Sequence, residues 1–225
     1  MPTAIVTGAS RGLGLALAHA LAERGWRLVV DAREGAALHA AAARLSGATA
    51  LPGDVGDPAH RQALVEAAGE RIDLLVNNAS LLGPSPQPGL ADYPLDVLEA
   101  VYRVNVLAPL ALIQLALPRL AEGARIVNVT SDAAVEAYEG WGGYGSSKAA
   151  LEQLTAVLAA EHPALRVYAV DPGDMNTRMQ QEAFPGEDVS DRAAPEERVP
   201  GLLRLLEGDL ESGRYAAAAL AGARA

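Results

Sequence analysis

Cysteine is absent from this chain of 225 residues, and only one of its 18 basic residues is a lysine. Without cysteine, disulfide bonds and thiolate chemistry are excluded, and cysteine usage gives no guide to the compartment. The 28 acidic residues bring the formal net charge to −10. The chain therefore lacks the basic surface with which proteins hold phosphate backbones, and no nucleic-acid partner is expected.

Long apolar runs are missing as well. The longest, VLAPLALIQLAL at 106–117, is shorter than a membrane span and contains a proline, which is typical of a buried helix. The first strand-like run follows Met1 directly, without the charged and apolar regions of a secretory signal. We expect no membrane partner and a cytoplasmic location.

The sequence alternates between β-rich and helical segments, and half of its residues are hydrophobic. Strands are predicted at 3–8, 27–32, 48–55, 72–79, 124–131, 165–173 and 212–220. Helices are predicted at 13–24, 35–45, 60–70, 146–161 and 199–207, with two more between 95 and 121. This alternation indicates an α/β fold, doubly wound, with about seven parallel strands and helices on both faces. We expect one domain over 1–225, in which 178–211 form a small substrate-loop and helix region.

A glycine-rich stretch, TGASRGLG at 7–14, follows the first predicted strand. Gly8, Gly12 and Gly14 have no Cβ, so the backbone could approach a pyrophosphate, and the next helix would direct free N–H groups at the anion. An ordinary strand–helix turn is the alternative. The place of the stretch after the first strand of a doubly wound chain favours dinucleotide binding.

The end of the second predicted strand, VVDAREG, offers both an acid and a base that could recognise the ribose 2′ position of a bound dinucleotide. An acid such as Asp31 would accept a hydrogen bond from a 2′-hydroxyl, whereas Arg33 would pair with a 2′-phosphate. This stretch alone leaves NAD and NADP open.

The lone lysine, Lys148, stands four residues after Tyr144 in YGSSK. Residues i and i+4 share a helix face, so the ammonium could lower the pKa of the phenol toward the range useful for acid–base catalysis. Ser131 ends the fifth predicted strand, where its hydroxyl could stabilise charge on a substrate oxygen. A serine that merely ends a strand is the alternative.

In order, the motifs TGASRGLG (7–14), DV (54–55), NNA (77–79), Asn105, Ser131, YGSSK (144–148) and PGDMNT (172–177) resemble those of the short-chain dehydrogenase/reductase family. The resemblance covers essentially the whole chain. It implies a single-domain Rossmann fold and an enzyme that catalyses reversible hydride transfer between a nicotinamide cofactor and a carbonyl or alcohol.

The resemblance also implies a role for each matching residue. Tyr144 would be the acid/base, Lys148 would lower its pKa and hold the nicotinamide ribose, Ser131 would polarise the carbonyl, and Asn105 would support a water in the proton relay. Ser10 and Arg11 would lie near the adenosine end, Asp54 at the adenine amino group and Asn77 near the adenosine ribose. The backbone after Pro172 and the Thr177 hydroxyl would orient the carboxamide. The implied cofactor-binding set is Gly8, Ser10, Arg11, Gly12, Leu13, Gly14, Arg33, Asp54, Val55, Asn77, Ala79, Tyr144, Lys148, Pro172, Gly173 and Thr177.

Two departures from the family pattern bear on the cofactor. Ser80 stands where NNAG is commoner, and would crowd the cofactor slightly. The acid of NAD-preferring relatives aligns with Ala32; Asp31 precedes it by one residue and would point to the opposite face of a strand. Arg33 matches the arginine of many NADP-preferring relatives, and Arg11 adds a second cation, so we predict NADP(H), without excluding NAD(H).

The remaining features are open to more than one interpretation. Trp141 either anchors the flexible turn YEGWGGYG or lines the substrate pocket. The tail TRMQQEAF (177–184) resembles pteridine-reducing members such as sepiapterin reductase, which makes a pteridine carbonyl the second substrate candidate. The four histidines have no metal-ligand spacing, and no metal is expected.

Three function classes were weighed. A carbonyl reductase or alcohol dehydrogenase is favoured over a dinucleotide-sensing regulatory protein, because a sensor would not need Asn105, Ser131, Tyr144 and Lys148 together. Epimerisation or dehydration would need a larger C-terminal substrate region. By family analogy we expect a homodimer or homotetramer formed through helices near 106–121 and 145–161.

Overall fold

The computed structural model describes residues 1–222, in which seven parallel strands form one sheet in the order β3-β2-β1-β4-β5-β6-β7. The strands are β1 (Thr3–Val6), β2 (Arg27–Ala32), β3 (Ala48–Pro52), β4 (Ile72–Asn77), β5 (Leu120–Val129), β6 (Arg166–Asp171) and β7 (Gly213–Ala216). The order reverses between β1 and β4, which is the switch point of a doubly wound sheet. The predicted α/β fold is confirmed.

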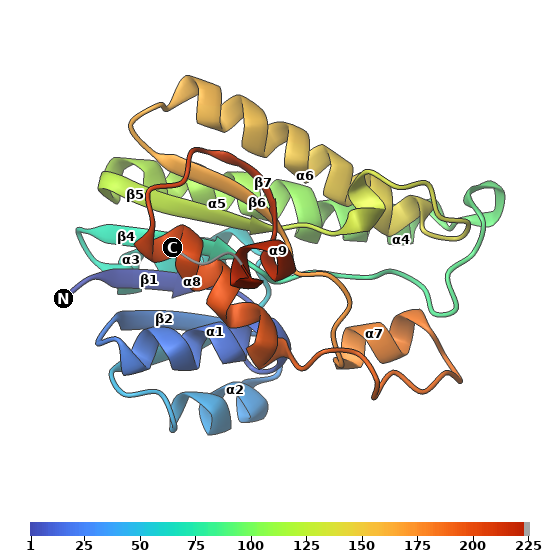
Figure 1. The fold of residues 1–225 in the computed structure, drawn as a ribbon, viewed down its shortest axis with the longest axis horizontal. Helices are drawn as coiled ribbons and strands as arrows, with labels where there is room; N and C mark the ends of the chain where they lie inside the picture. Colours follow the sequence, from blue (N-terminus) through green and yellow to red (C-terminus); the bar gives the residue numbers. More distant parts are fainter. Residues whose placement is uncertain (223–225) are drawn as a thin grey trace.

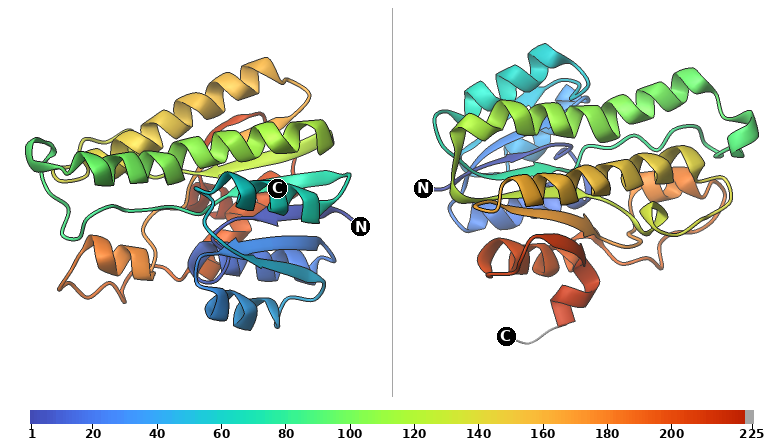
Figure 2. Two further views of the ribbon diagram at one scale, coloured as in Figure 1. Left: turned by 180° about the vertical axis from the view of Figure 1, so that it is seen from behind. Right: turned by 90° about the horizontal axis from the view of Figure 1, so that it is seen from above.

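The helices form a layer on each face of the sheet (Figures 1 and 2). They are α1 (Gly12–Glu23), α2 (Gly35–Ala42), α3 (Pro58–Ala68), α4 (Leu95–Tyr102), α5 (Ala108–Ala116), α6 (Gly142–Glu161), α7 (Arg178–Ala183), α8 (Val199–Glu207) and α9 (Ala217–Gly222). Alternating strand residues separate the two cores. Ala4 and Val6 pack with α1 and α8, whereas Ile5 packs with α3, α5 and α6. The continuous apolar runs of the strands reflect this burial on both faces.

The two helices predicted between 95 and 121 are one continuous helix, Leu95–Arg119. A π-helical turn (Arg103–Leu107) joins α4 to α5 and absorbs the break that Pro109 would cause in a regular helix. Within residues 1–222 this is the one helix long and apolar enough to cross a bilayer, but it packs on the sheet with 44% of its most apolar window buried. Core helices have the same length and composition, so this is weak evidence for a membrane.

Two other predicted boundaries were wrong. The last strand was predicted to reach residue 220, but β7 ends at Ala216 and α9 follows, because a run of alanines favours helix. The long helix α6 begins at Gly142 rather than at 146, which places Tyr144 in its first turn. Lys148 lies one turn further along, so the two side chains do share a helix.

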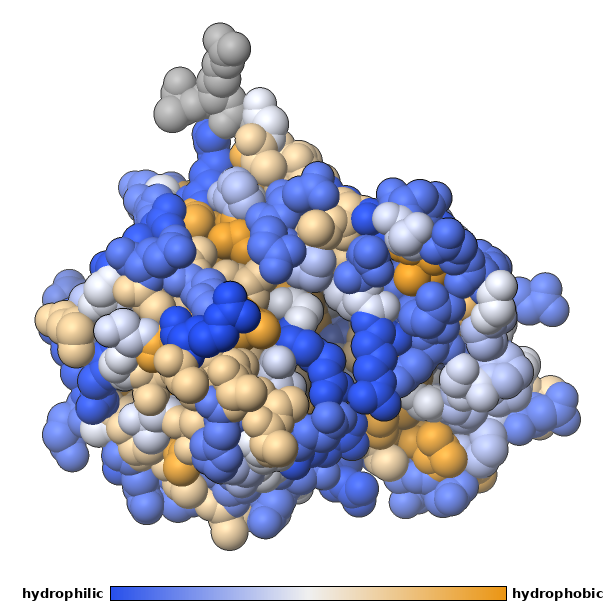
Figure 3. All heavy atoms as spheres, turned by 90° about the horizontal axis from the view of Figure 1, so that it is seen from below, coloured by the Kyte–Doolittle hydropathy of each residue, from blue (hydrophilic) through white to orange (hydrophobic). Residues whose placement is uncertain are grey.

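The loop after β4 and the segment around α7 extend beyond the carboxyl ends of the strands, at the right of Figure 1. Seen from below, the surface is dominated by hydrophilic residues and is hollowed near the middle (Figure 3).

Candidate active site

A cavity of about 610 Å³ lies at the carboxyl ends of the central strands. It is lined by most of the residues singled out from the sequence: Gly8, Ser10, Arg11, Gly12, Leu13, Arg33, Asp54, Val55, Ala79, Ser131, Trp141, Tyr144, Lys148, Pro172, Gly173 and Thr177. The structure therefore brings together segments from residue 8 to residue 177, because parallel strands place their ends at the same edge of the sheet. No group of three or more potential metal ligands occurs in the part of the chain described.

The glycine-rich loop is shaped for close approach of a ligand to backbone. Gly8 has φ +69°, a left-handed conformation that favours glycine. At Gly14 a Cβ would lie 2.5 Å from both the Asn78 amide nitrogen and the Gly8 carbonyl oxygen. No side chain caps the N-terminus of α1 and no acid lies in its first turn, so its N–H groups can receive an anion. These features fit a dinucleotide pyrophosphate.

Three predicted residues lie outside the cavity lining. Gly14 is packed beneath the loop, and Asn105 is 1% exposed. Asn77 differs more from expectation: its amide donates to Asn128 Oδ1 at 2.8 Å inside the protein, so its side chain does not face the adenosine ribose. Asn78 lines the cavity instead, and its side-chain amide donates a hydrogen bond to the Gly8 carbonyl oxygen at 3.1 Å. In a strand end, consecutive residues face opposite ways, and the motif alone does not say which asparagine faces the ligand.

Asp31 is committed to the protein interior. Its Oδ1 accepts from the Gly8 N–H at 2.7 Å, its Oδ2 lies 3.0 Å from His60 Nε2, and the residue is 1% exposed. Both carboxylate oxygens thus stabilise the glycine loop and α3. His60 of α3 therefore has a structural role in holding this carboxylate.

A cluster of guanidinium groups borders the cavity beside the end of β2. Arg11 Nη2 lies 2.5 Å from Glu34 Oε2, and Arg178 Nη1 of α7 lies 3.4 Å from Glu34 Oε1. Arg11, followed by Arg178 and Arg33, holds the pKa of the Glu34 carboxyl below its usual value. Three arginines therefore converge on one anion at this point. The contribution of Arg178 was not foreseen, because it lies 144 positions from Glu34 in the sequence.

Tyr144 and Lys148 are buried side by side. Lys148 Nζ lies 5.4 Å from the Tyr144 ring centroid and donates to the Val129 carbonyl at 2.8 Å. Burial raises the pKa of Tyr144 to about 12 and lowers that of Lys148 to about 7. The expected lowering of the phenol pKa is not found, because desolvation of the phenolate has the largest effect, and burial disfavours the charged form of Lys148 as well. A raised pKa keeps the phenol protonated at neutral pH, the form that can donate a proton.

Ser131 stands at the cavity edge, directly after β5. Its hydroxyl donates to Asp132 Oδ1 at 2.9 Å and accepts from the Ala133 N–H at 3.2 Å. This bond to Asp132 would have to be exchanged for one to a substrate oxygen. The other carboxylate oxygen of Asp132 accepts a hydrogen bond from the Tyr138 hydroxyl at 3.1 Å.

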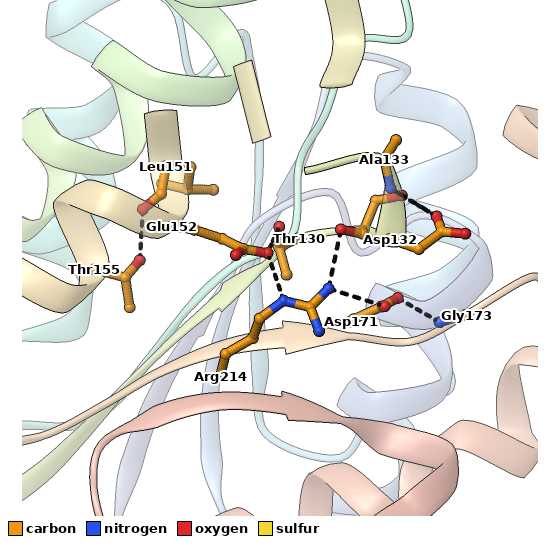
Figure 4. A network of polar contacts seen from close by, with 10 residues as sticks. Thr130, Asp132, Ala133, Leu151, Glu152, Thr155, Asp171, Gly173 and Arg214 are labelled. Atoms are coloured by element: carbon orange, nitrogen blue, oxygen red, sulfur yellow. Dashed lines mark hydrogen bonds and ion pairs between the residues drawn. The ribbon is translucent and has the colours of Figure 1, made fainter. Parts of the chain in front are cut away.

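Arg214 of β7 joins helix α6 to the ends of β5 and β6 (Figure 4). Its guanidinium lies 2.9 Å from Glu152 Oε1, 3.2 Å from Asp171 Oδ2 and 3.3 Å from the Ser131 carbonyl oxygen. Asp171 in turn accepts from the Gly173 N–H at 2.8 Å, in the turn that follows β6. Arg214 thereby fixes the backbone on both sides of the cavity. Only the register of β7 on β6 brings it there, so the sequence offered no signal for it.

The side of the cavity away from the glycine loop is apolar and aromatic. Trp141 packs edge-on against Tyr144 with ring centroids 5.9 Å apart, and against Phe184 at 5.7 Å. Leu82, Met179 and Ala183 complete this wall. Trp141 is thus more than an anchor for a turn, since it lines the cavity next to Tyr144.

These features coincide with known relatives. A family model described as short chain dehydrogenase matches residues 2–188. A 3-oxoacyl-acyl-carrier-protein reductase of rhamnolipid biosynthesis from Pseudomonas aeruginosa is 38% identical over 78% of this chain and 73% of its own length. A benzil reductase from Saccharomyces cerevisiae that forms (S)-benzoin is 33% identical over 88% of this chain and 79% of its own.

Solved structures agree with the sequence relatives. A short chain dehydrogenase from Shigella flexneri complexed with NADP superposes with a TM-score of 0.89 at 28% identity, covering 96% of each chain. One from Escherichia coli complexed with NADPH gives 0.88 at 29% identity and the same coverage. The chain belongs to the short-chain dehydrogenase/reductase family. It is an oxidoreductase that acts on carbonyl or alcohol groups with a nicotinamide cofactor.

Proposed function

We propose that this enzyme is an NADPH-dependent reductase of uncharged carbonyl compounds that carry an aromatic or bulky apolar substituent. The observation that carries the proposal is the composition of the cavity: arginines surround one end, and the Trp141 wall borders Tyr144 at the other. When bound, the nicotinamide supplies the hydride. The residues of the chain position the substrate and move the proton.

Tyr144 is proposed to protonate the carbonyl oxygen as the acid, and to act as base in the reverse direction. Its pKa of about 12 favours the protonated form that reduction needs. Lys148 balances the charge of the phenolate that forms, and the Ser131 hydroxyl donates to the same substrate oxygen. Asn105 bonds to the backbone of Leu81, which makes it a brace for the loop beside Tyr144.

NADP(H) is favoured over NAD(H) by the adenosine end of the cavity. Both oxygens of Asp31 already have a partner within the protein and the residue is 1% exposed, which makes it a poor acceptor for a ribose 2′-hydroxyl. Arg11, Arg33 and Arg178 together form a cationic place in which a 2′-phosphate could replace the Glu34 carboxylate. Structural relatives bound to NADP and NADPH support this choice.

The substrate class follows from the apolar wall and its rim. Trp141 and Met179 offer a ring and a thioether to an aromatic or apolar group, and Phe184 packs against Trp141. Asp132 and Asp174 line the same cavity, and an anionic substrate would be repelled by them. The name of the yeast relative, a benzil reductase, agrees with a diaryl substrate. A pteridine carbonyl also offers a flat ring for this wall.

The test is a comparison of kcat/KM for NADPH and NADH with benzil, 1-phenyl-1,2-propanedione, sepiapterin and acetoacetyl-coenzyme A. We expect NADPH to be preferred at least about tenfold, the effect of one charged contact, and the aryl diketones to exceed the coenzyme A thioester. Arg33→Gln should lower kcat/KM for NADPH and leave that for NADH nearly unchanged. A tenfold preference for NADH would overturn the cofactor assignment, and a preference for the thioester would overturn the substrate class.

A homodimer or homotetramer stays a prediction, as does the cytoplasmic location. Helices α5 and α6 are expected to form the contacts between subunits. Leu107, just before α5, is 57% exposed, and Val157 of α6 is 43% exposed. The enzyme is proposed to be one domain in which residues 178–211 border the substrate side.

A further inference from the structure

Ser80 connects two elements of the active site. It follows β4 in the segment NNAS and lines the same cavity as Tyr144. Its hydroxyl donates to Asn105 Oδ1 at 3.2 Å. Burial is the main cause of the raised pKa of Tyr144, and the nearby Ser80 hydroxyl opposes that effect. One serine hydroxyl therefore lies between a buried amide and the acid–base group.

We propose that Ser80 is a positioning residue that transfers its hydrogen bond from Asn105 to Tyr144 whenever Tyr144 loses its proton. Ser80 keeps its own proton throughout; only the acceptor of its O–H changes. As Tyr144 gives its proton to the substrate oxygen, the Ser80 hydroxyl turns from Asn105 Oδ1 to the new phenolate oxygen. The proposal concerns the acid–base step of the proposed function and rests on it.

The surroundings of Asn105 allow this exchange. Asn105 Oδ1 also accepts from the Leu81 N–H at 2.8 Å, so it remains hydrogen-bonded after Ser80 turns away. Its amide nitrogen stays fixed by Leu81 O at 2.9 Å and Ser147 Oγ at 3.0 Å. No buried polar group is left without a partner, which is the usual cost of breaking a buried hydrogen bond. Ser80 is thus free to move while Asn105 holds its position.

The other groups around Tyr144 make a movable donor useful. Burial opposes the phenolate, and Asp171 and Asp132 oppose it further through their negative charge. Lys148 of α6 is the cation that faces the ring, and burial favours its neutral form. The apolar side chains that cluster with Tyr144 are Leu82, Ala133, Trp141, Met179 and Ala183. A neutral donor such as Ser80 stabilises the phenolate without adding a buried charge.

The experiment compares Ser80→Ala with Ser80→Gly, Ser80→Thr and the control Ser146→Ala. Ser146 is exposed on α6 and its hydroxyl bonds only to the Gly143 carbonyl, so its removal leaves Tyr144 untouched. Ser80→Ala and Ser80→Gly should raise the kinetic pKa of kcat/KM by about 0.5 to 1 unit, the effect of one hydrogen bond to the charged form. The alkaline limb of reduction then moves to higher pH, and so does the acidic limb of alcohol oxidation. Ser80→Thr, which keeps the hydroxyl, should restore the wild-type profile.

A second readout does not depend on turnover. In protein labelled with ¹³C at tyrosine Cζ, the Tyr144 signal is assigned by its loss in Tyr144→Phe and followed against pH. We expect it to titrate at higher pH in Ser80→Ala than in wild type and Ser146→Ala. Unchanged titration and pH profiles in Ser80→Ala would overturn the proposal. Absence of turnover with every carbonyl, accompanied by the shifted ¹³C titration, would overturn the proposed function and leave the role of Ser80 standing.

Discussion

Replacing Tyr144 by phenylalanine is expected to lower kcat for carbonyl reduction by about 10³-fold or more, the range attributed to a positioned general acid. The ring is 8% exposed and packs edge-on against Trp141, and the variant keeps that packing while losing only the hydroxyl. Steady-state assays with NADPH and an aryl diketone measure the loss. Titration followed by NADPH fluorescence should give a Kd within about threefold of wild type, because loss of the phenol hydroxyl removes at most one hydrogen bond to the cofactor.

The matched control is Tyr138→Phe. Tyr138 lies six residues earlier, is 47% exposed and donates its hydroxyl to Asp132. Its loss should change kcat by less than about threefold, as for one exposed hydrogen bond. A Tyr144→Phe enzyme that retained a tenth of the wild-type kcat would remove Tyr144 from the acid–base role.

The second large effect is expected for Lys148→Arg, a change that keeps the positive charge. Lys148 is 2% exposed, and its compact ammonium fits between the Val129 carbonyl and the Tyr144 ring. A guanidinium is larger and planar, and the site has little room for it because burial is deep enough to lower the pKa of Lys148 to about 7. We expect kcat to fall about 100-fold and the protein to lose stability. Activity assays and chemical denaturation measure the two effects.

A lysine-for-arginine exchange on the surface provides the comparison. Arg71 has a side chain that is 73% exposed and pairs with Asp73, so Arg71→Lys should leave both activity and stability within error. If Lys148→Arg behaved like Arg71→Lys, a plain positive charge would suffice at this position. The single lysine of the chain would then have no special chemical reason to be there.

Much of the site could be predicted because its parts are local. The glycine loop depends on three glycines in eight residues, and Tyr144 and Lys148 on one helical turn. The parallel sheet with helices on both faces follows from the alternation of strands and helices, which permits few topologies. The tertiary surroundings of each residue could not be predicted from the sequence in this way. The raised pKa of Tyr144 comes from burial among side chains of four separate segments.

The residues that sequence reasoning missed act across long separations. Arg214 reaches Ser131 and Asp171 from the seventh strand, and Arg178 reaches Glu34 across the cavity mouth. Asn77 and Asn78 are adjacent, and only the direction of the chain after β4 decides which of them lines the cavity. Such contacts depend on strand register and loop path, which a motif does not encode.

The most direct test of the proposed function is transfer of deuterium from [4-²H]NADPH to benzil, using both C4 stereoisomers and mass spectrometry of the product. We expect one stereoisomer to yield benzoin with deuterium on the carbinol carbon, and the other to yield unlabelled benzoin. Tyr144→Phe should form neither product at a measurable rate. NADPH binding without label transfer to any aryl or apolar carbonyl would contradict the account.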